Sequence, residues 1–170
     1  RPATASGFGA PPPRAIRCPE AMNAAILSIG DELLLGHHVD TNTAWLAARL
    51  LEQGVSTVEH RTLGDDRPAL AGTIAALAAH VHVLIMTGGL GPTSDDITRD
   101  ALGDVFAPGE SLVLDQDALR QLERWFRGRS GGMPQRNRVQ AMRPRGMSMI
   151  PNPHGTAPGL AGRTGSCLVF

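Results

Sequence analysis

The sequence predicts an α/β fold, a three-layer α/β/α sandwich with a mostly parallel central sheet. Short apolar strand patterns alternate with amphipathic helix patterns, which favours βαβ units joined by right-handed crossovers. The most apolar strand pattern, VHVLIMT at 81–87, is one continuous run, which is typical of a strand buried on both faces. The 170 residues are enough for one ordinary domain with a real core.

The first strand and helix are predicted near the start of this domain. AAILSIG at 24–30 is a short apolar run that ends in glycine, as buried strands often do. A helix is predicted at 40–54, where Asp40 or Thr41 can cap its start and Gly54 suits the position just past its end. Its expected apolar stripe consists of Leu46, Ala47, Leu50 and Leu51.

The second strand–helix pair leads into the apolar strand at 81–87. VSTVEHRTL at 55–63 is a strand candidate, and a helix is predicted over 67–80 with Pro68 in its first turn. The apolar residues at helical spacing here are Leu70, Ile74, Leu77, Ala78 and Val81. Two further amphipathic helices are predicted, at 97–106 and 115–129.

The two ends of the chain differ from its body. Residues 1–21 are rich in Pro, Gly and Ala and lack apolar periodicity, so we expect a disordered tail. Met22 opens the domain, which we expect to cover 22–170. Because Phe170 stands in an expected strand, we expect this domain to be truncated at its carboxyl end.

Composition excludes several classes of function. The formal net charge is zero, so no overall field attracts nucleic acid or a membrane surface. All 16 basic residues are arginine, which excludes a lysine Schiff base and a P-loop lysine. No apolar run approaches the roughly 20 residues of a membrane span. Cys18 and Cys167 lack zinc spacing, and we expect them to be reduced in a cytoplasmic protein, although a disulfide stays open. The sequence allows a homo-oligomer.

A glycine-rich turn follows the apolar strand. Gly88, Gly89 and Gly91 let the backbone approach a ligand, and the following helix start favours an anion. These features are typical of phosphate binding, although the turn has neither the third glycine of the dinucleotide fingerprint nor a P-loop lysine. The alternative is a tight strand-to-helix turn in which Thr93 and Asp96 form a capping box.

Acidic pairs stand in three loops, 30–40, 63–67 and 88–96, that a parallel sheet brings to one edge. The pairs are Asp31 with Glu32, Asp65 with Asp66, and Asp95 with Asp96. Like charges repel, so a shared cation is expected, and Mg²⁺ suits one or two carboxylates plus phosphate oxygens. The alternative is that each pair caps a helix or is solvated.

A third group of polar residues lies near the carboxyl end. Arg136 and Arg138 flank Asn137, and with Arg143 they are candidates for a phosphate or carboxylate, or for a solvated charged face. HGTAPG at 154–159 has the composition of a rigid turn. The adjacent His37 and His38 are expected at the surface rather than on a metal.

These stretches resemble the amino-terminal domain of the CinA family, competence/damage-inducible proteins. The resemblance covers about 24–163 and is carried, in order, by SIGDELLLGHHVDTNTAWLAARLLEQG, LGDDRPAL, MTGGLGPTSDDITRDAL, RNRVQAM and NPHGTAPGL. That domain is in turn similar to the molybdopterin-binding domains of the MogA, MoaB and MoeA group. The resemblance implies the three-layer fold. It also implies that Asp65 and Asp96 match two aspartates that are essential in the related pterin-adenylylating proteins.

The resemblance implies hydrolysis of the ADP-ribose pyrophosphate bond with a divalent metal, Mg²⁺, Mn²⁺ or Co²⁺. Full-length CinA has a second domain that deamidates nicotinamide mononucleotide, for which this chain is too short. Two alternatives stay open: a molybdopterin-binding module without turnover, and adenylyl transfer to a pterin. In each case the partner is a small nucleotide or pterin, not nucleic acid or a membrane.

The candidate site residues follow from the loops and from the resemblance. Asp65 and Asp96 are the expected catalytic residues and metal ligands. The expected ligand-binding residues are Gly30, Asp31, Glu32, Asn42, Gly88, Gly89, Gly91, Pro92, Thr93, Ser94, Asp95, Thr98, Asn137, Gly155 and Thr156.

Overall fold

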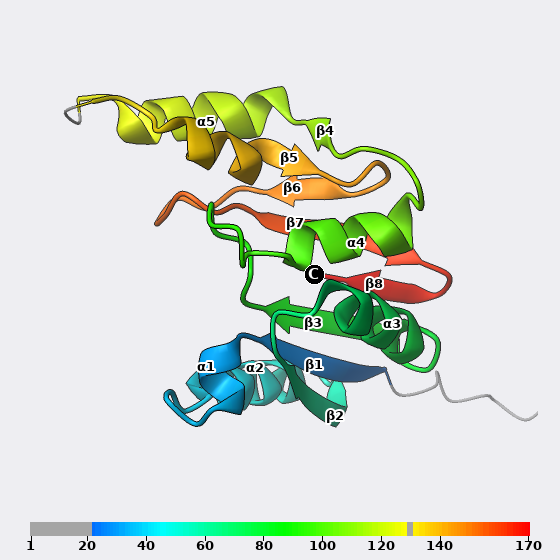
Figure 1. Cartoon of the computed structure of the whole chain (residues 1–170). Helices are drawn as coiled ribbons and strands as arrows, with labels where there is room; N and C mark the ends of the chain where they lie inside the picture. Colours follow the sequence, from blue (N-terminus) through cyan, green and yellow to red (C-terminus); the bar gives the residue numbers. More distant parts are fainter. Residues whose placement is uncertain (1–21, 129–130) are drawn as a thin grey trace, which may run out of the picture.

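A six-stranded sheet runs through the middle of the molecule, in the order β2-β1-β3-β8-β7-β6 (Figure 1). The strands are β1 (Asn23–Ile29), β2 (Ser56–Leu63), β3 (Val83–Thr87), β6 (Ser148–Ile150), β7 (Gly159–Thr164) and β8 (Cys167–Val169). Neighbours pair in parallel from β2 to β8, whereas β7 runs antiparallel to both β8 and β6. The mostly parallel sheet predicted from the sequence is therefore confirmed.

The computed structural model describes residues 22–128 and 131–170. The tail predicted for 1–21 and Cys18 lie outside these residues, as does the last position of the helix predicted at 115–129.

Helices flank the sheet. They are α1 (Asp31–Leu34), α2 (Thr41–Glu52), α3 (Arg67–Ala78), α4 (Thr98–Phe106), α5 (Gln116–Phe126) and the 3-10 helix η1 (Gln135–Ala141). The chain steps from β1 to β2 in one direction and from β2 to β3 in the other. Right-handed crossovers therefore place α2 and α3 on opposite faces. In Figure 1, α3 and α4 lie in front of the sheet and α2 lies behind β1.

A smaller unit lies beside β6. The two-stranded ladder of β4 (Val113–Leu114) and β5 (Met142–Arg143) joins α5 and η1, which pack on each other. Their buried side chains, Ala118, Leu119, Leu122 and Ala141, form a second apolar cluster. Neither short strand was predicted from the sequence, because two-residue strands have no periodicity to detect.

Aspartates begin three of the helices. The side chains of Asp40, Asp66 and Asp115 accept hydrogen bonds from the first-turn N–H groups of α2, α3 and α5, respectively. The predicted cap at Asp40 is thus confirmed, and so is Gly54, which follows the end of α2 with a φ of +75°.

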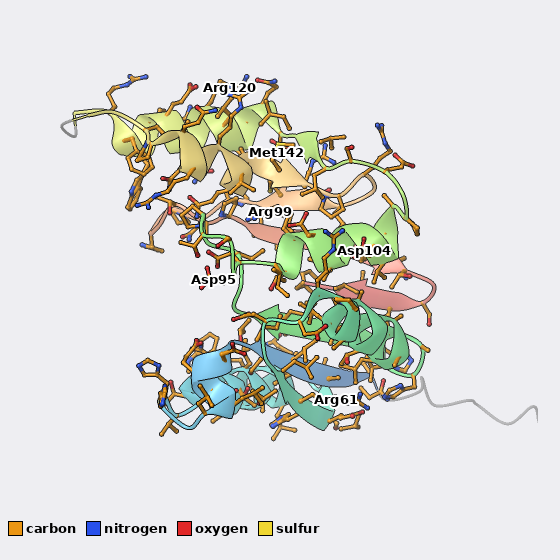
Figure 2. All side chains as sticks on the ribbon, in the orientation of Figure 1. Arg61, Asp95, Arg99, Asp104, Arg120 and Met142 are labelled. Carbon is orange, nitrogen blue, oxygen red and sulfur yellow. The ribbon has the colours of Figure 1, made fainter. Side chains whose placement is uncertain are left out.

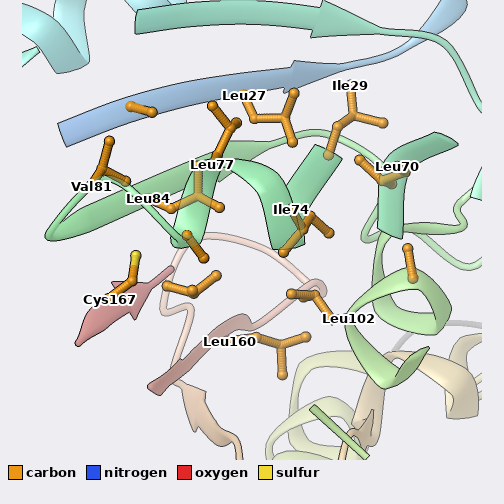
Figure 3. Close-up of a cluster of buried hydrophobic side chains, with 14 of the residues drawn as sticks. Leu27, Ile29, Leu70, Ile74, Leu77, Val81, Leu84, Leu102, Leu160 and Cys167 are labelled. Atoms are coloured by element: carbon orange, nitrogen blue, oxygen red, sulfur yellow. The ribbon is translucent and has the colours of Figure 1, made fainter. Parts of the chain in front are cut away.

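The main core lies between the sheet and α3 (Figure 3). Leu70, Ile74 and Leu77 are fully buried, as their helical spacing predicts, and they meet Leu27 and Leu84 from the sheet. Burying each such side chain contributes roughly 1.5–3 kcal/mol. Val81 is buried too, but it lies between α3 and β3, so the helix ends earlier and the strand begins later than predicted.

The stripe predicted for α2 is wrong in one respect. No residue of α2 is buried, and Leu51 is 67% exposed. The physical reason is position: α2 packs on β1 and on the edge strand β2, and it lies at the border of the sheet. In the part of the chain that the structure describes, no helix has the length and apolar character needed to cross a membrane.

Candidate functional site

The loops that follow β1, β2 and β3 meet at one edge of the sheet, as the parallel topology predicts (Figure 1). The N–H of Gly30 donates to the carbonyl of Leu63 at 2.9 Å. The N–H of Asp65 donates to Oδ1 of Asp31 at 3.2 Å. A Cβ atom placed on Gly88 would lie 2.0 Å from the carbonyl oxygen of Ile29. The end of β1 therefore touches the loops of both its neighbours.

The turn after β3 requires glycine at two positions. Gly88 has a φ of +106° and Gly89 a φ of +63°, conformations that side chains disfavour. A Cβ on Gly89 would lie 2.2 Å from Oγ1 of Thr98. Thr98 is 2% exposed, and its hydroxyl donates to the carbonyl of Gly88 at 3.0 Å. Thr98 therefore stabilises the turn by a hydrogen bond from the buried side.

Asp96 turns its carboxylate back onto its own loop. Oδ1 accepts from the N–H of Gly91 at 2.7 Å, and Oδ2 accepts from the N–H of Thr93 at 2.8 Å and from its hydroxyl at 2.5 Å. Burial alone would raise the pKa of Asp96, but these hydrogen bonds outweigh burial and hold the pKa below its ordinary value.

One of these bonds belongs to the alternative capping box, because the carboxylate of Asp96 accepts from the N–H of Thr93. Thr93 and Asp96 nevertheless do not cap the helix α4. The helix α4 begins at Thr98, and its N-cap residue, Ile97, makes no side-chain cap bond. The hydrogen bonds of Asp96 also correct the expectation that Gly91 offers its N–H to phosphate, because Asp96 already accepts from that group.

Other backbone donors of the turn stay open. Among the described residues, no hydrogen bond is made by the N–H groups of Gly88, Gly89 and Leu90. The turn lies against the start of α4, because the carbonyls of Gly88 and Gly89 accept from the hydroxyl and the N–H of Thr98, and the helix dipole adds a partial positive charge there. Open N–H groups beside a helix N-terminus are the usual arrangement for binding an anion.

Arg99 is a functional candidate that sequence reasoning missed. Its side chain is 1% exposed, and its Nη2 donates to the carbonyl of Leu90 at 3.0 Å. Burial lowers the pKa of Arg99, and the nearby negative charges of Asp100 and Asp96 oppose that shift only in part. No pattern in the sequence marks this arginine, because arginines in a first helical turn are usually solvated.

Of the six carboxylates expected at this edge, four act on one another: Asp31, Glu32, Asp65 and Asp95. Burial raises the pKa of Asp65, and the negative charges of Asp31, Glu32 and Asp95 raise it further. The other two members of the predicted pairs are engaged elsewhere: Asp66 caps α3, and Asp96 binds its own loop. In Figure 2, Asp95 lies at the outer edge of the molecule and Arg99 further in, at the start of α4.

The carboxylates fit a hard cation, but not as a complete ligand set. Within 22–128 and 131–170, no group of three or more His, Cys, Asp or Glu side chains is placed to hold a metal ion. The unrelieved repulsion on Asp65 favours a positive charge nearby. Mg²⁺ needs only one or two carboxylates when phosphate oxygens complete its shell, so the donors fit a metal that arrives with a phosphate.

A cleft of about 320 Å³ adjoins the glycine turn. The expected ligand residues Glu32 and Asn42 line it together with His38, Thr87 and Gly88. Asp40, at its wall, accepts hydrogen bonds from the hydroxyls of Ser28 and Thr43. The cleft thus lies between polar groups at the start of α2 and the first residue of the glycine turn, Gly88.

The loop between β6 and β7 starts from the same edge, since β7 runs antiparallel to β8. Gly155 and Thr156 of this loop line a separate small hollow against Gln121 and Trp125 of α5. Asn152 shapes the loop by donating to the carbonyl of Ala157 at 2.9 Å.

Two more candidates have partners within the smaller unit. Asn137 is 6% exposed, and its amide donates to Gln140 at 2.9 Å. Arg143 donates to Asp115 at 3.0 Å and to the carbonyl of Met147 at 2.8 Å. The guanidinium of Arg143 thus joins β5 to the start of α5, and the structure does not bring it to the glycine turn.

Comparison with known proteins gives a consistent result. The family model described as a probable molybdopterin binding domain matches residues 25–170. A CinA-like protein from Citrifermentans bemidjiense is 44% identical over 149 residues, covering 88% of this chain and 36% of the relative. A CinA-like protein from Shigella flexneri is 43% identical over 149 residues, covering 88% and 37%. The chain spans about a third of the length of the curated relatives it matches.

Solved structures show the same fold. The protein CinA from Thermoplasma acidophilum, crystallised as a protein of unknown function, matches with a TM-score of 0.78 and 32% identity. The match covers 88% of this chain and 86% of that one. The molybdopterin biosynthesis enzyme MoaB from Thermus thermophilus matches with a TM-score of 0.51 and 20% identity, over 87% and 78% of the two chains. The second match shows the fold alone.

Proposed function

The chain belongs to the family of probable molybdopterin binding domains and is CinA-like, and on this basis we propose that its edge loops bind the phosphates of a small nucleotide. We propose further that the domain hydrolyses the pyrophosphate bond of ADP-ribose with a divalent metal, releasing AMP and ribose 5-phosphate. The observation that supports this most is that the open N–H groups of Gly88, Gly89 and Leu90 and the carboxylate of Asp65, whose pKa is raised by burial and neighbouring negative charges, follow the two strands that flank β1, at one edge of the sheet.

In this proposal, different groups of the protein bind the phosphates and the nucleoside part of the substrate. The N–H groups of Gly88 and Gly89 donate to phosphate oxygens, and the start of α4 stabilises the negative charge that they hold. Glu32 and Asn42, in the adjoining cleft, offer an acceptor and an amide to the hydroxyls of the nucleoside part. These contacts orient the pyrophosphate so that its bridging bond lies near Asp65.

Asp65 and Asp96 are the proposed metal ligands. A divalent ion bound there would neutralise phosphate charge and lower the pKa of a bound water. Asp96 accepts three hydrogen bonds from its loop, and an ionised carboxylate has about four acceptor positions, so one remains. The backbone N–H of Asp31 compensates the charge of Asp65 only in part, since the pKa of Asp65 stays above its ordinary value, and we propose that this carboxylate also positions water.

A molybdopterin-binding module without turnover is the second candidate. It is favoured by the description of the family and by the absence, among the described residues, of a metal ligand set that is complete by itself. Adenylyl transfer to a pterin would use the same two aspartates and the same turn.

The test is incubation of the pure protein with ADP-ribose and with ATP, each with Mg²⁺, Mn²⁺ or Co²⁺. AMP release from ADP-ribose, abolished in Asp65→Asn and retained in Asp104→Asn, supports the hydrolase. Asp104 is a fair control because it lies on the outer side of α4, paired with Arg67. Binding of molybdopterin without any release of AMP would instead establish the binding module.

A further inference from the structure

The buried guanidinium of Arg99 has fewer hydrogen-bond partners than it has donors. Arginine has five N–H donors, yet the single hydrogen bond that the described residues give Arg99 goes to the carbonyl of Leu90. Its Nε is buried and has no partner among the described residues. Leaving a buried donor unpaired is costly, so packing alone does not explain an arginine at this position.

Arg99 and Asp96 hold one peptide group from opposite sides. The carbonyl of Leu90 accepts from Arg99 at 3.0 Å, and the N–H of Gly91, in the same peptide plane, donates to Asp96 at 2.7 Å. Because the peptide is planar, fixing both its ends fixes the orientation of the plane. The two clamping side chains come from the same short stretch of chain at the start of α4, so the turn is tied to the helix that follows it.

We propose that Arg99 is a positioning residue for phosphate binding, which with Asp96 clamps the Leu90–Gly91 peptide and keeps the N–H groups of Gly89 and Leu90 turned toward the ligand. The inference rests on the proposed phosphate-binding function of this turn. The clamp leaves these two N–H groups without protein partners, as a donor site for an anion requires. The positive charge of Arg99 also attracts the carboxylate of Asp96, its partner in the clamp.

The experiment compares ligand affinity with stability in the full chain. Titration calorimetry with inorganic pyrophosphate and Mg²⁺, which the proposed reaction does not consume, gives the Kd, and thermal melts give the Tm, for the wild type, Arg99→Met and Arg99→Lys. Arg67→Met is the matched control. Arg67, on α3, pairs with Asp104 of α4, the helix that carries Arg99, but this pair lies away from the turn. We expect Arg99→Met to weaken binding by about tenfold or more, the loss typical of one hydrogen bond to a charged group. Arg99→Lys, which keeps a charged donor, should recover most of this affinity, and Arg67→Met should bind like the wild type.

A merely structural role gives a different result, since the Tm of Arg99→Met would fall while its Kd stayed at the wild-type value. That outcome overturns the proposal. If Arg99→Met does not fold, amide NMR of the wild type decides: on addition of inorganic pyrophosphate, the N–H resonances of Gly89 and Leu90 must shift as binding saturates. Saturation without those shifts overturns the proposal as well.

The readout separates this inference from the proposed hydrolysis. A wild type that binds ADP-ribose but releases no AMP contradicts the hydrolase alone, because the comparison at Arg99 depends only on Kd. A wild type that binds neither ADP-ribose nor pyrophosphate overturns both.

Discussion

At the scale of single residues, Gly88 shows most directly why the turn has its composition. Its backbone lies against the carbonyl of Ile29, so a side chain there would separate the ends of β1 and β3. Gly54 also has a positive φ, +75°, but a Cβ atom placed on it would meet no other atom within 4 Å. The two glycines therefore separate the effect of backbone conformation from the effect of close contact.

We expect Gly54→Ala to lower the free energy of unfolding by roughly 1–2 kcal/mol, the cost of the left-handed conformation. Gly88→Ala should lower it by a further ~1–3 kcal/mol, because the added atom must displace backbone. Urea denaturation measures both. Equal losses at the two positions would contradict the close approach of β1 and the turn.

Asp65 is a residue whose charge the fold tolerates poorly. Burial and the charges of Asp31, Glu32 and Asp95 raise its pKa above the ordinary value of 3.8. Below pH 3.8 the carboxyl is protonated in both the folded and the unfolded states and has no effect. As the pH rises through the raised pKa, the unfolded state ionises first, so stability is lost and remains lower at neutral pH.

Asp65→Asn should therefore raise the Tm at pH 7, and the gain should shrink as the pH is lowered toward 4. Asp104→Asn is the control with the opposite sign, because the hydrogen bonds from Arg67 hold the pKa of Asp104 below its ordinary value. Melts across this pH range check both variants. A Tm of Asp65→Asn that is lower than that of the wild type at pH 7 would show that Asp65 stabilises the fold.

At the scale of elements, α2 depends on its first residues more than on its apolar stripe. None of its residues is buried, so packing contributes less here than in α3. Its cap, Asp40, binds the N–H of Thr43 at 2.9 Å and also reaches Ser28 of β1. Burial alone would raise the pKa of Asp40, but these hydrogen bonds lower it below the ordinary value.

Asp40→Ala should lower the free energy of unfolding by about 2 kcal/mol at pH 7, at the upper end of the range for caps. Asp66→Ala, which removes a cap bonded only to Ala69, should cost about 1 kcal/mol. Because the folded pKa of Asp40 is depressed, its contribution is present above pH 3.8 and is lost as the pH falls through the folded value. Equal costs for the two caps at pH 7 would show that the bond to Ser28 adds nothing.

At the scale of the whole molecule, the proposed function requires the edge of the sheet to bind a metal and a phosphate together. The carboxylates repel one another, and the described residues do not complete a metal shell. The open N–H groups of the turn favour an anion, which the neighbouring carboxylates oppose. Each ligand therefore improves the site for the other.

Thermal melts should show a small stabilisation by Mg²⁺ alone. Mg²⁺ with ADP-ribose should raise the Tm by more than the sum of the two separate shifts. The matched control is Asp65→Asn, in which this excess should disappear. Purely additive shifts in the wild type would contradict the metal bridge and would leave the carboxylates without a shared cation.

Much of this architecture was predictable from the sequence, because its signals are local. The apolar run at 81–87, the helical spacing of Leu70, Ile74 and Leu77, and the cap at Asp40 each depend on residues within a few positions of one another. The meeting of the three acidic loops also followed from the sequence, since a parallel sheet places successive strand ends at one edge. The strands β4, β5 and β6 did not, because two or three residues are too few to show a period.

By itself, the sequence determined the alternating strands and helices, the glycine turn and the carboxylates beside it. Only the tertiary structure decided which groups are paired. It turned Asp96 onto its own loop, left Asp65 among like charges, buried Arg99 beneath Leu90 and left α2 without a buried residue. The physical reason is that hydrogen-bond partners, charge and burial depend on how the elements pack against one another, and side-chain type and spacing do not specify that packing.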